Sequence, residues 1–129
     1  DLFRDEGRAF VVMQRAKTGD LRQALLKLHT ARKLFPKQGD WSGKVTRQIL
    51  LALQYCHNMD YVHGNLKPEN VLIMNEGQQM EDHPYVALTD LSAARQSGEP
   101  RRTWNTPGYA APELLEDPEA ERPESDMFA

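Results

Sequence analysis

The residues of this chain that are best suited to chemistry lie in one polar segment, between an apolar helix pattern and a short apolar strand pattern. The segment reads His63-Gly64-Asn65-Leu66-Lys67-Pro68-Glu69-Asn70-Val71-Leu72. It holds two side-chain amides, an amine and a carboxylate, and a second carboxylate, Asp90, follows the next apolar strand pattern. Amide and carboxylate oxygens are ligands that Mg²⁺ takes, and a lysine is a point charge for phosphate. A polar loop that only joins a helix to a strand would also fit this composition.

Five segments together resemble one family in their order and spacing. Residues 63–72 resemble the catalytic loop of protein kinases, H-R-D-x-K-P-E-N, in its Ser/Thr-kinase form. Asp90-Leu91-Ser92 stands at the place of the D-F-G motif, and residues 106–113 resemble the end of the activation segment, T-P-x-Y-x-A-P-E. Residues 125–128 resemble the start of the following helix, and residues 12–16 resemble the hinge between the lobes. Small-molecule kinases lack the Lys-Pro-Glu-Asn and Ala-Pro-Glu elements found here.

The resemblance implies an α+β fold, a truncated protein-kinase-like domain that spans the end of the small lobe and the first half of the large lobe. Residues 1–16 would form a small-lobe strand and the hinge. Residues 17–129 would form the large-lobe portion with the catalytic loop and the activation segment. No segment of this chain matches the glycine-rich loop or the strand Lys that cover ATP in the family, and in the family's order both precede the stretch that is matched here.

The resemblance also implies roles for individual side chains. Asn65 stands at the position of the catalytic base, Lys67 would reach the transferred phosphate, and Thr106 would hydrogen-bond the catalytic loop. Asn70 and Asp90 match the family's metal pair, so Mg²⁺ is one implied cofactor. Each residue also has a plainer interpretation, as a turn residue, a strand-end cap or a solvated lysine.

The second implied cofactor is ATP. Its candidate binding residues, by the family's pattern, are the hinge and pocket positions Met13, Gln14, Ala16, Asp20, Glu69, Leu72 and Asp90. Met13 and Leu72 would be apolar core residues on any interpretation. Asp20 and Glu69 are equally well explained as solvated carboxylates.

Asn65 is the main departure from the pattern, because an amide cannot take up the substrate's hydroxyl proton near neutral pH. The sequence therefore predicts a pseudokinase or a very slow kinase that binds Mg-ATP and acts as a scaffold or allosteric partner of another protein. One alternative is an active Ser/Thr kinase that transfers the γ-phosphate of ATP to protein hydroxyls with a degenerate base. The other is a structural interaction module that binds no nucleotide.

Two smaller departures concern the activation segment. Gly64 replaces an Arg that senses loop phosphorylation in many kinases, so phosphate on Ser97 or Thr103 has no expected partner in this loop, although Arg95, Arg101 and Arg102 are near in sequence. Leu91-Ser92 replaces Phe-Gly, and Ser lacks the freedom of Gly at positive φ.

Several elements must position these residues. Apolar patterning predicts a buried strand at 9–13, a helix from Leu21 to about residue 34 with Asp20 as its N-cap, and a mostly buried helix from about Ser42 to Asn58. Strands at 71–74 and 85–89 should pair as a hairpin across a polar loop. Beyond Asp90 the chain should be irregular, with the acidic stretch 113–126 on the surface.

Composition and charge narrow the other classes of protein to which the chain could belong. The chain has 129 residues and a net charge of −3, which offers no basic surface for nucleic acid. No apolar run is long enough to span a membrane. The single Cys56 excludes an internal disulfide and favours a reducing compartment such as the cytoplasm. The four histidines show no metal-ligand spacing.

Overall fold

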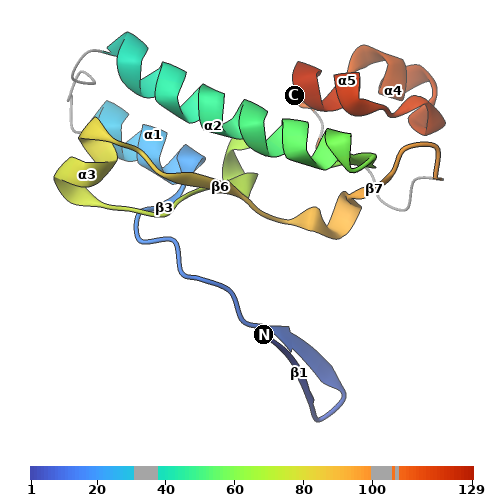
Figure 1. Ribbon diagram of the computed structural model, residues 1–129, viewed down its shortest axis with the longest axis horizontal. Coiled ribbons are helices and arrows are strands. Elements are labelled where there is room, and N and C mark those ends of the chain that lie inside the picture. Colours follow the sequence, from blue (N-terminus) through green and yellow to red (C-terminus); the bar gives the residue numbers. More distant parts are fainter. Residues whose placement is uncertain (31–37, 100–105, 107) are drawn as a thin grey trace.

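The computed structural model describes residues 1–30, 38–99, 106 and 108–129 (Figure 1). At its N-terminus, β1 (Leu2–Asp5) and β2 (Arg8–Val11) form an antiparallel hairpin. The rings of Phe3 and Phe10 stack with their centroids 5.0 Å apart. The hairpin extends away from the other elements in Figure 1.

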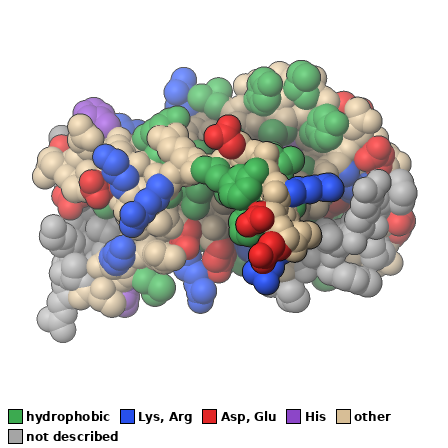
Figure 2. Space-filling model, turned by 90° about the horizontal axis from the view of Figure 1, so that it is seen from below, with side chains coloured by type: hydrophobic (Ala, Val, Ile, Leu, Met, Phe, Trp, Pro, Cys, Tyr) green, Lys and Arg blue, Asp and Glu red, His purple; other side chains and the backbone are tan. Residues whose placement is uncertain are grey.

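The prediction of a buried strand at 9–13 is wrong in two respects. The strand ends at Val11, and Val11 and Met13 are 65% and 68% exposed. The physical reason is that apolar side chains are buried only where a second surface covers them, and no other described element makes an extensive contact with this hairpin. Figure 2, a view from below, shows hydrophobic side chains gathered in the middle of the face.

Helix α1 (Leu21–Thr30) begins where the sequence predicts. The Asp20 carboxylate accepts hydrogen bonds from the backbone N–H of Gln23 and from its side-chain amide, both at 2.7 Å. Asp20 is therefore the predicted N-cap, because it satisfies a backbone donor that the first turn leaves open. The predicted end near residue 34 lies outside the described residues.

Helix α2 (Gln38–Asn58) is the longest element and begins four residues before the predicted start at Ser42. Trp41, Val45 and Leu53 are buried along one stripe. Leu50 and Leu51 are 41% and 46% exposed, so the prediction of a mostly buried helix is wrong for this face. The buried stripe is the one that faces the sheet, where Trp41 and Val45 belong to the core cluster.

The central sheet has the strand order β3-β5-β6. Its members are β3 (Gly19–Asp20), β5 (Val71–Ile73) and β6 (Val86–Leu88), all antiparallel to their neighbours. The pairing of Val71 with Leu88 and of Ile73 with Val86 confirms the predicted hairpin. The loop between them is not irregular, because it contains α3 (Gly77–Asp82). The sequence did not predict this short helix, because its residues are mostly polar and show no apolar periodicity.

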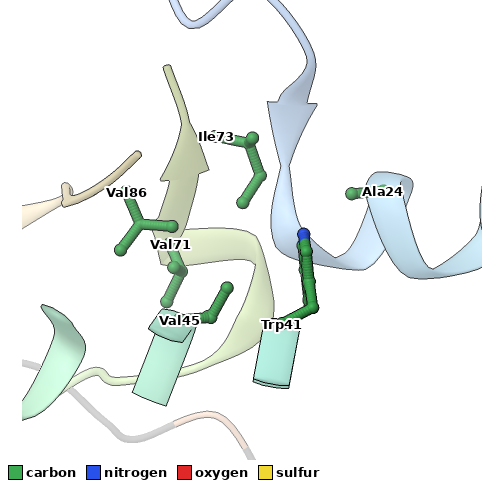
Figure 3. Close-up of a cluster of buried hydrophobic side chains, with 6 residues drawn as sticks. All are labelled: Ala24, Trp41, Val45, Val71, Ile73 and Val86. Atoms are coloured by element: carbon green, nitrogen blue, oxygen red, sulfur yellow. The ribbon is translucent and has the colours of Figure 1, made fainter. Parts of the chain in front are cut away.

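The core lies between the sheet and the two helices α1 and α2. Figure 3 shows Val71, Ile73 and Val86 directed toward Val45 and Trp41 of α2, with Ala24 of α1 nearby. The indole N–H of Trp41 donates to the carbonyl of Met80 at 2.8 Å, which joins α2 to α3. This packing holds the ends of β5 and β6, from which the candidate site residues extend.

A second, smaller layer completes the chain. β4 (Tyr61–Val62) pairs with β7 (Arg95–Gln96). The short helix η1 (Pro68–Asn70) lies within the catalytic-loop segment, and η2 (Leu91–Ala93) begins within the D-F-G-like segment. α4 (Pro112–Glu116), η3 (Pro118–Ala120) and α5 (Pro123–Phe128) lie beside the end of α2 (Figure 1). No helix in the described part of the chain is long and apolar enough to cross a membrane.

The acidic stretch 113–126 does not lie wholly on the surface as predicted. Glu121, Ser125 and Asp126 are no more than 5% exposed. These polar groups are buried because they have partners: Ser125 donates to Glu113, and Asp126 and Glu121 bind groups of the catalytic loop region described below.

Candidate functional site

The loop from His63 to Asn70 is anchored by α5. The buried carboxylate of Asp126 accepts hydrogen bonds from the backbone N–H of His63 at 2.8 Å and of Gly64 at 2.9 Å. Its Oδ2 also lies 2.9 Å from Nε2 of His57, near the end of α2. Asp126 therefore ties the loop to two helices. The sequence placed Asp126 only at the start of a helix. No local sequence pattern indicates that its carboxylate accepts hydrogen bonds from two successive N–H groups of a distant loop.

His63 supports the loop from inside. It is 1% exposed, and the Asn65 N–H donates to its Nδ1 at 3.3 Å. Because Nδ1 accepts, the ring proton resides on Nε2, which donates to the carbonyl of Thr89 at 3.1 Å. His63 thus joins the loop to the end of β6 and fixes the backbone of Asn65.

Asn65, Asn70 and Asp90 meet where the amino end of β5 lies beside the carboxyl end of β6. The Asn65 side-chain amide donates to Oδ2 of Asp90 at 3.1 Å. The Asn70 amide donates to the backbone carbonyl of Asn65 at 2.7 Å and to Oδ2 of Asp90 at 3.4 Å. The two predicted metal ligands and the residue at the base position therefore share one hydrogen-bond network.

Thr106 and Lys67 extend this network toward the activation segment. The Lys67 ammonium donates to Oγ1 of Thr106 at 2.8 Å, and that hydroxyl donates to Oδ1 of Asn65 at 3.1 Å. Both polar atoms of the Asn65 amide are thus engaged, one with Asp90 and one with Thr106. The amide orientation follows from this pattern, because only the nitrogen can donate to a carboxylate.

Asp90 adopts a left-handed backbone conformation, with φ of 60°, at the start of η2. The Ser92 hydroxyl donates to its Oδ1 at 2.6 Å. This hydrogen bond, with smaller contributions from the Ser92 backbone N–H, the Asn65 amide and the charge of Lys67, lowers the pKa of Asp90 despite partial desolvation. Asp90 is therefore an anion at neutral pH, available to a cation.

Two of the three departures from the family pattern meet at Asp90. Asn65 binds one carboxylate oxygen and Ser92 binds the other. The sequence predicted Ser92 to restrict backbone motion, and the hydrogen bond to Asp90 was missed. An Asp-x-Ser spacing allows such a side-chain contact, so this signal was available.

Asn70 and Asp90 carry the side-chain types that Mg²⁺ takes, an amide and a carboxylate. In this structure the amide nitrogen of Asn70, not its oxygen, faces Oδ2 of Asp90 at 3.4 Å, so the amide would have to turn to place a hard oxygen donor beside the carboxylate. Among the described residues, no group of three or more His, Cys, Asp or Glu side chains forms a denser metal centre.

The predicted hinge residues lie apart from this cluster. Met13 and Gln14 are exposed and Ala16 is half-buried on the extended stretch between β2 and β3. No hydrogen bond between described residues joins these three residues to the cluster. Their predicted role at the adenine edge remains a prediction.

Three other predicted nucleotide residues lie nearer the sheet. Asp20 of β3 is paired with the half-buried Leu72 of β5. Glu69 of η1 approaches Nη1 of Arg22 at 3.5 Å, which joins the catalytic loop to α1. Both carboxylates therefore have partners within the chain, Asp20 as a helix cap and Glu69 as an ion-pair acceptor.

The fold, the loop and the polar cluster together define a protein kinase domain of the Ser/Thr type, present in part. The family model described as "Protein kinase domain" matches residues 1–129, and the chain belongs to this family.

Similar proteins include the serine/threonine-protein kinase dkf-2 of Caenorhabditis briggsae, which is 38% identical over 115 residues. CBL-interacting protein kinase 4 of Oryza sativa subsp. japonica is 36% identical over 109 residues. Serine/threonine-protein kinase SIK1 of Rattus norvegicus is 34% identical over 128 residues. The matches cover 84%, 84% and 93% of this chain but only 9%, 23% and 14% of those relatives.

Proposed function

We propose that this chain is part of a pseudokinase domain that binds Mg-ATP and acts on a partner protein as a scaffold or allosteric regulator. The observation that carries the proposal is the position of Asn65. Its amide lies between Asp90 and Thr106, at the centre of the cluster, where the family's base is expected. We also propose that residues 1–16 belong to the small lobe and 17–129 to the large lobe.

The amide limits the chemistry of the site. Asn65 can orient a substrate hydroxyl through its carbonyl oxygen but cannot hold the released proton. Loss of a general base slows a reaction by roughly 10²–10⁴-fold, which corresponds to about 3–5 kcal/mol of barrier. Kinase transition states are loose, so the proton moves late and some transfer survives.

The remaining parts support nucleotide binding. Asn70 and Asp90 would hold Mg²⁺, which supplies charge neutralisation between phosphate oxygens when it is bound. Lys67, held by Thr106, would direct its ammonium to the same phosphates. Met13, Gln14, Ala16, Asp20, Glu69 and Leu72 would contribute to the nucleotide pocket, as the family pattern implies.

Two observations favour the alternatives. The clustering of Lys67, Asn70, Asp90 and Thr106 would equally serve a slow but active Ser/Thr kinase. The hydrogen bonds of Asn65 and Ser92 to Asp90 would serve a domain that binds neither metal nor nucleotide, because they satisfy the carboxylate internally.

Binding and transfer by the complete protein separate the three functions. For the pseudokinase we expect ATP with Mg²⁺, at about 100 times its Kd, to stabilise the domain by about 2.7 kcal/mol, measured from thermal shifts. Phosphate transfer should stay well below about 1 s⁻¹. Turnover at or above that rate would establish an active kinase, and no thermal shift at saturating ATP would establish the interaction module.

Two variants sharpen this test. Asp90→Asn should abolish the difference between the shifts with and without Mg²⁺, because it removes the anionic ligand. Asn65→Asp should raise the transfer rate by roughly 10²–10⁴-fold if the other parts are competent. The control is Asn58→Asp, which makes the same substitution at an exposed position at the end of α2 and should change neither quantity.

A further inference from the structure

A buried ion pair joins the start of the activation segment to the stretch after η3. Nε of Arg95, in β7, donates to Oε2 of Glu121 at 2.9 Å. The two side chains are 7% and 2% exposed. Nη2 of Arg95 is also buried and has no hydrogen-bond partner among the described residues. A guanidinium in such surroundings depends on a nearby carboxylate, because an unpaired buried charge is strongly unfavourable.

Gly64 makes room for this pair. A Cβ atom added there would lie 3.3 and 3.4 Å from the two carboxylate oxygens of Glu121, and 3.0 Å from the carbonyl oxygen of Ala93. Gly64 also has φ of +74°, a conformation that a larger residue adopts with strain. The catalytic loop thus carries no side chain where the Glu121 carboxylate packs against it.

The pair lies beside the hydrogen bonds that order β7. Arg95 and Gln96 pair with Val62 and Tyr61 of β4, and the N–H of Ser97 donates to the carbonyl of Asp60 at 2.9 Å. β7 is only two residues long, so this short ladder gives little stability of its own. A charged side chain clamped inside the protein would hold it in place.

We propose that Arg95 and Glu121 form a built-in latch that keeps the start of the activation segment against the catalytic loop. Arg95 and Glu121 are positioning residues in this proposal. The carboxylate comes from the chain itself, so ordering of β7 requires no phosphate group on the segment and no bound nucleotide. The inference goes beyond the proposed function, because it holds whether or not the domain transfers phosphate.

The test is amide hydrogen exchange on the complete protein without nucleotide, resolved by segment. Glu121→Gln keeps the shape of the side chain and removes its charge, and Arg95→Met removes the guanidinium. Each variant should speed exchange at the amides of residues 61–62 and 95–97 by about tenfold or more, while amides of β5 change less than about twofold. The exposed Glu116→Gln is the matched control and should leave both segments unchanged.

A double variant tests whether the two side chains act as a pair. Arg95→Met with Glu121→Leu removes both charges, so its effect on exchange should be smaller than the sum of the single effects. Unchanged exchange at 95–97 in the single variants would overturn the latch. Equal acceleration in β5, or additive effects in the double variant, would also overturn it, because the pair would then be a general core contact.

Discussion

The Asn65 side chain gives the Asp90 carboxylate a hydrogen-bond donor that does not depend on a bound cation. Its amide nitrogen donates to Oδ2 of Asp90, while its oxygen accepts from Thr106. An aspartate at this position would place a second carboxylate within hydrogen-bond distance of the first. Like charges this close repel, although solvent at the exposed Asp90 weakens the effect.

We therefore expect Asn65→Asp to lower the free energy of unfolding of the metal-free domain by about 1 kcal/mol. Added Mg²⁺ should reverse this loss, because a cation between the carboxylates removes the repulsion. Denaturant unfolding of the complete domain with EDTA and with Mg²⁺ measures both quantities. A variant that is as stable as the wild type in EDTA would contradict this interpretation of Asn65.

Ser92 is the main reason that the pKa of Asp90 is lowered. Ser92→Ala should raise the pKa of Asp90 toward its ordinary value, measured by carboxyl ¹³C NMR titration. The folded-state pKa is depressed, so this carboxylate stabilises the fold fully above the unfolded pKa of about 4 and less as pH falls through the folded pKa. In Ser92→Ala the folded and unfolded pKa values of Asp90 should lie closer together, so this pH-dependent stabilisation should shrink. The Ser97→Ala variant should keep it.

At the scale of elements, α2 is the support of the site. It packs against β6 and carries Trp41 and Val45 into the core below the strands whose ends hold Asn70 and Asp90. At its other end, His57 reaches Asp126, which anchors the catalytic loop. One helix thus holds both the sheet and the loop.

Trp41 tests this support. Trp41→Ala should lower the free energy of unfolding of the complete domain by about 3–5 kcal/mol, because it leaves a cavity in the core. Trp41→Phe should cost less, since it keeps most of the packing and loses chiefly the hydrogen bond to Met80. Chemical denaturation measures both, and equal losses in the two variants would show that packing is not the larger contribution.

At the scale of the whole molecule, the described surface carries many exposed apolar side chains. The hairpin contributes Leu2, Phe3 and Val11, and α5 contributes Met127 and Phe128. Exposure of this kind is typical of surfaces that another part of a domain covers.

We expect the 129 residues in isolation to aggregate or to lack a cooperative thermal transition. The hydrophobic core is small, and the exposed apolar side chains favour association. Calorimetry combined with sedimentation measures this. A single cooperative transition of a monomer would contradict the expectation.

The sequence by itself determined the family, the α+β class, the pairing of the two central strands and the N-cap at Asp20. Each depends on residues that are local in sequence: motif spacing, apolar alternation and a capping side chain next to its helix. It also identified the members of the polar cluster, because the family's spacing implied them before any coordinates did.

The tertiary structure alone decided which polar groups share a partner and which apolar groups are covered. Asn65 and Ser92 converge on Asp90, Asp126 holds the catalytic loop, and Glu121 is buried against Arg95. The contacts of Asn65, Asp126 and Glu121 join residues far apart in the chain, so no local pattern encodes them. The Asp-x-Ser spacing allows the Ser92 contact, but the rotamers of the two side chains decide whether it forms. The same holds for the hairpin, whose apolar pattern predicted burial while its exposure depended on what lies against it.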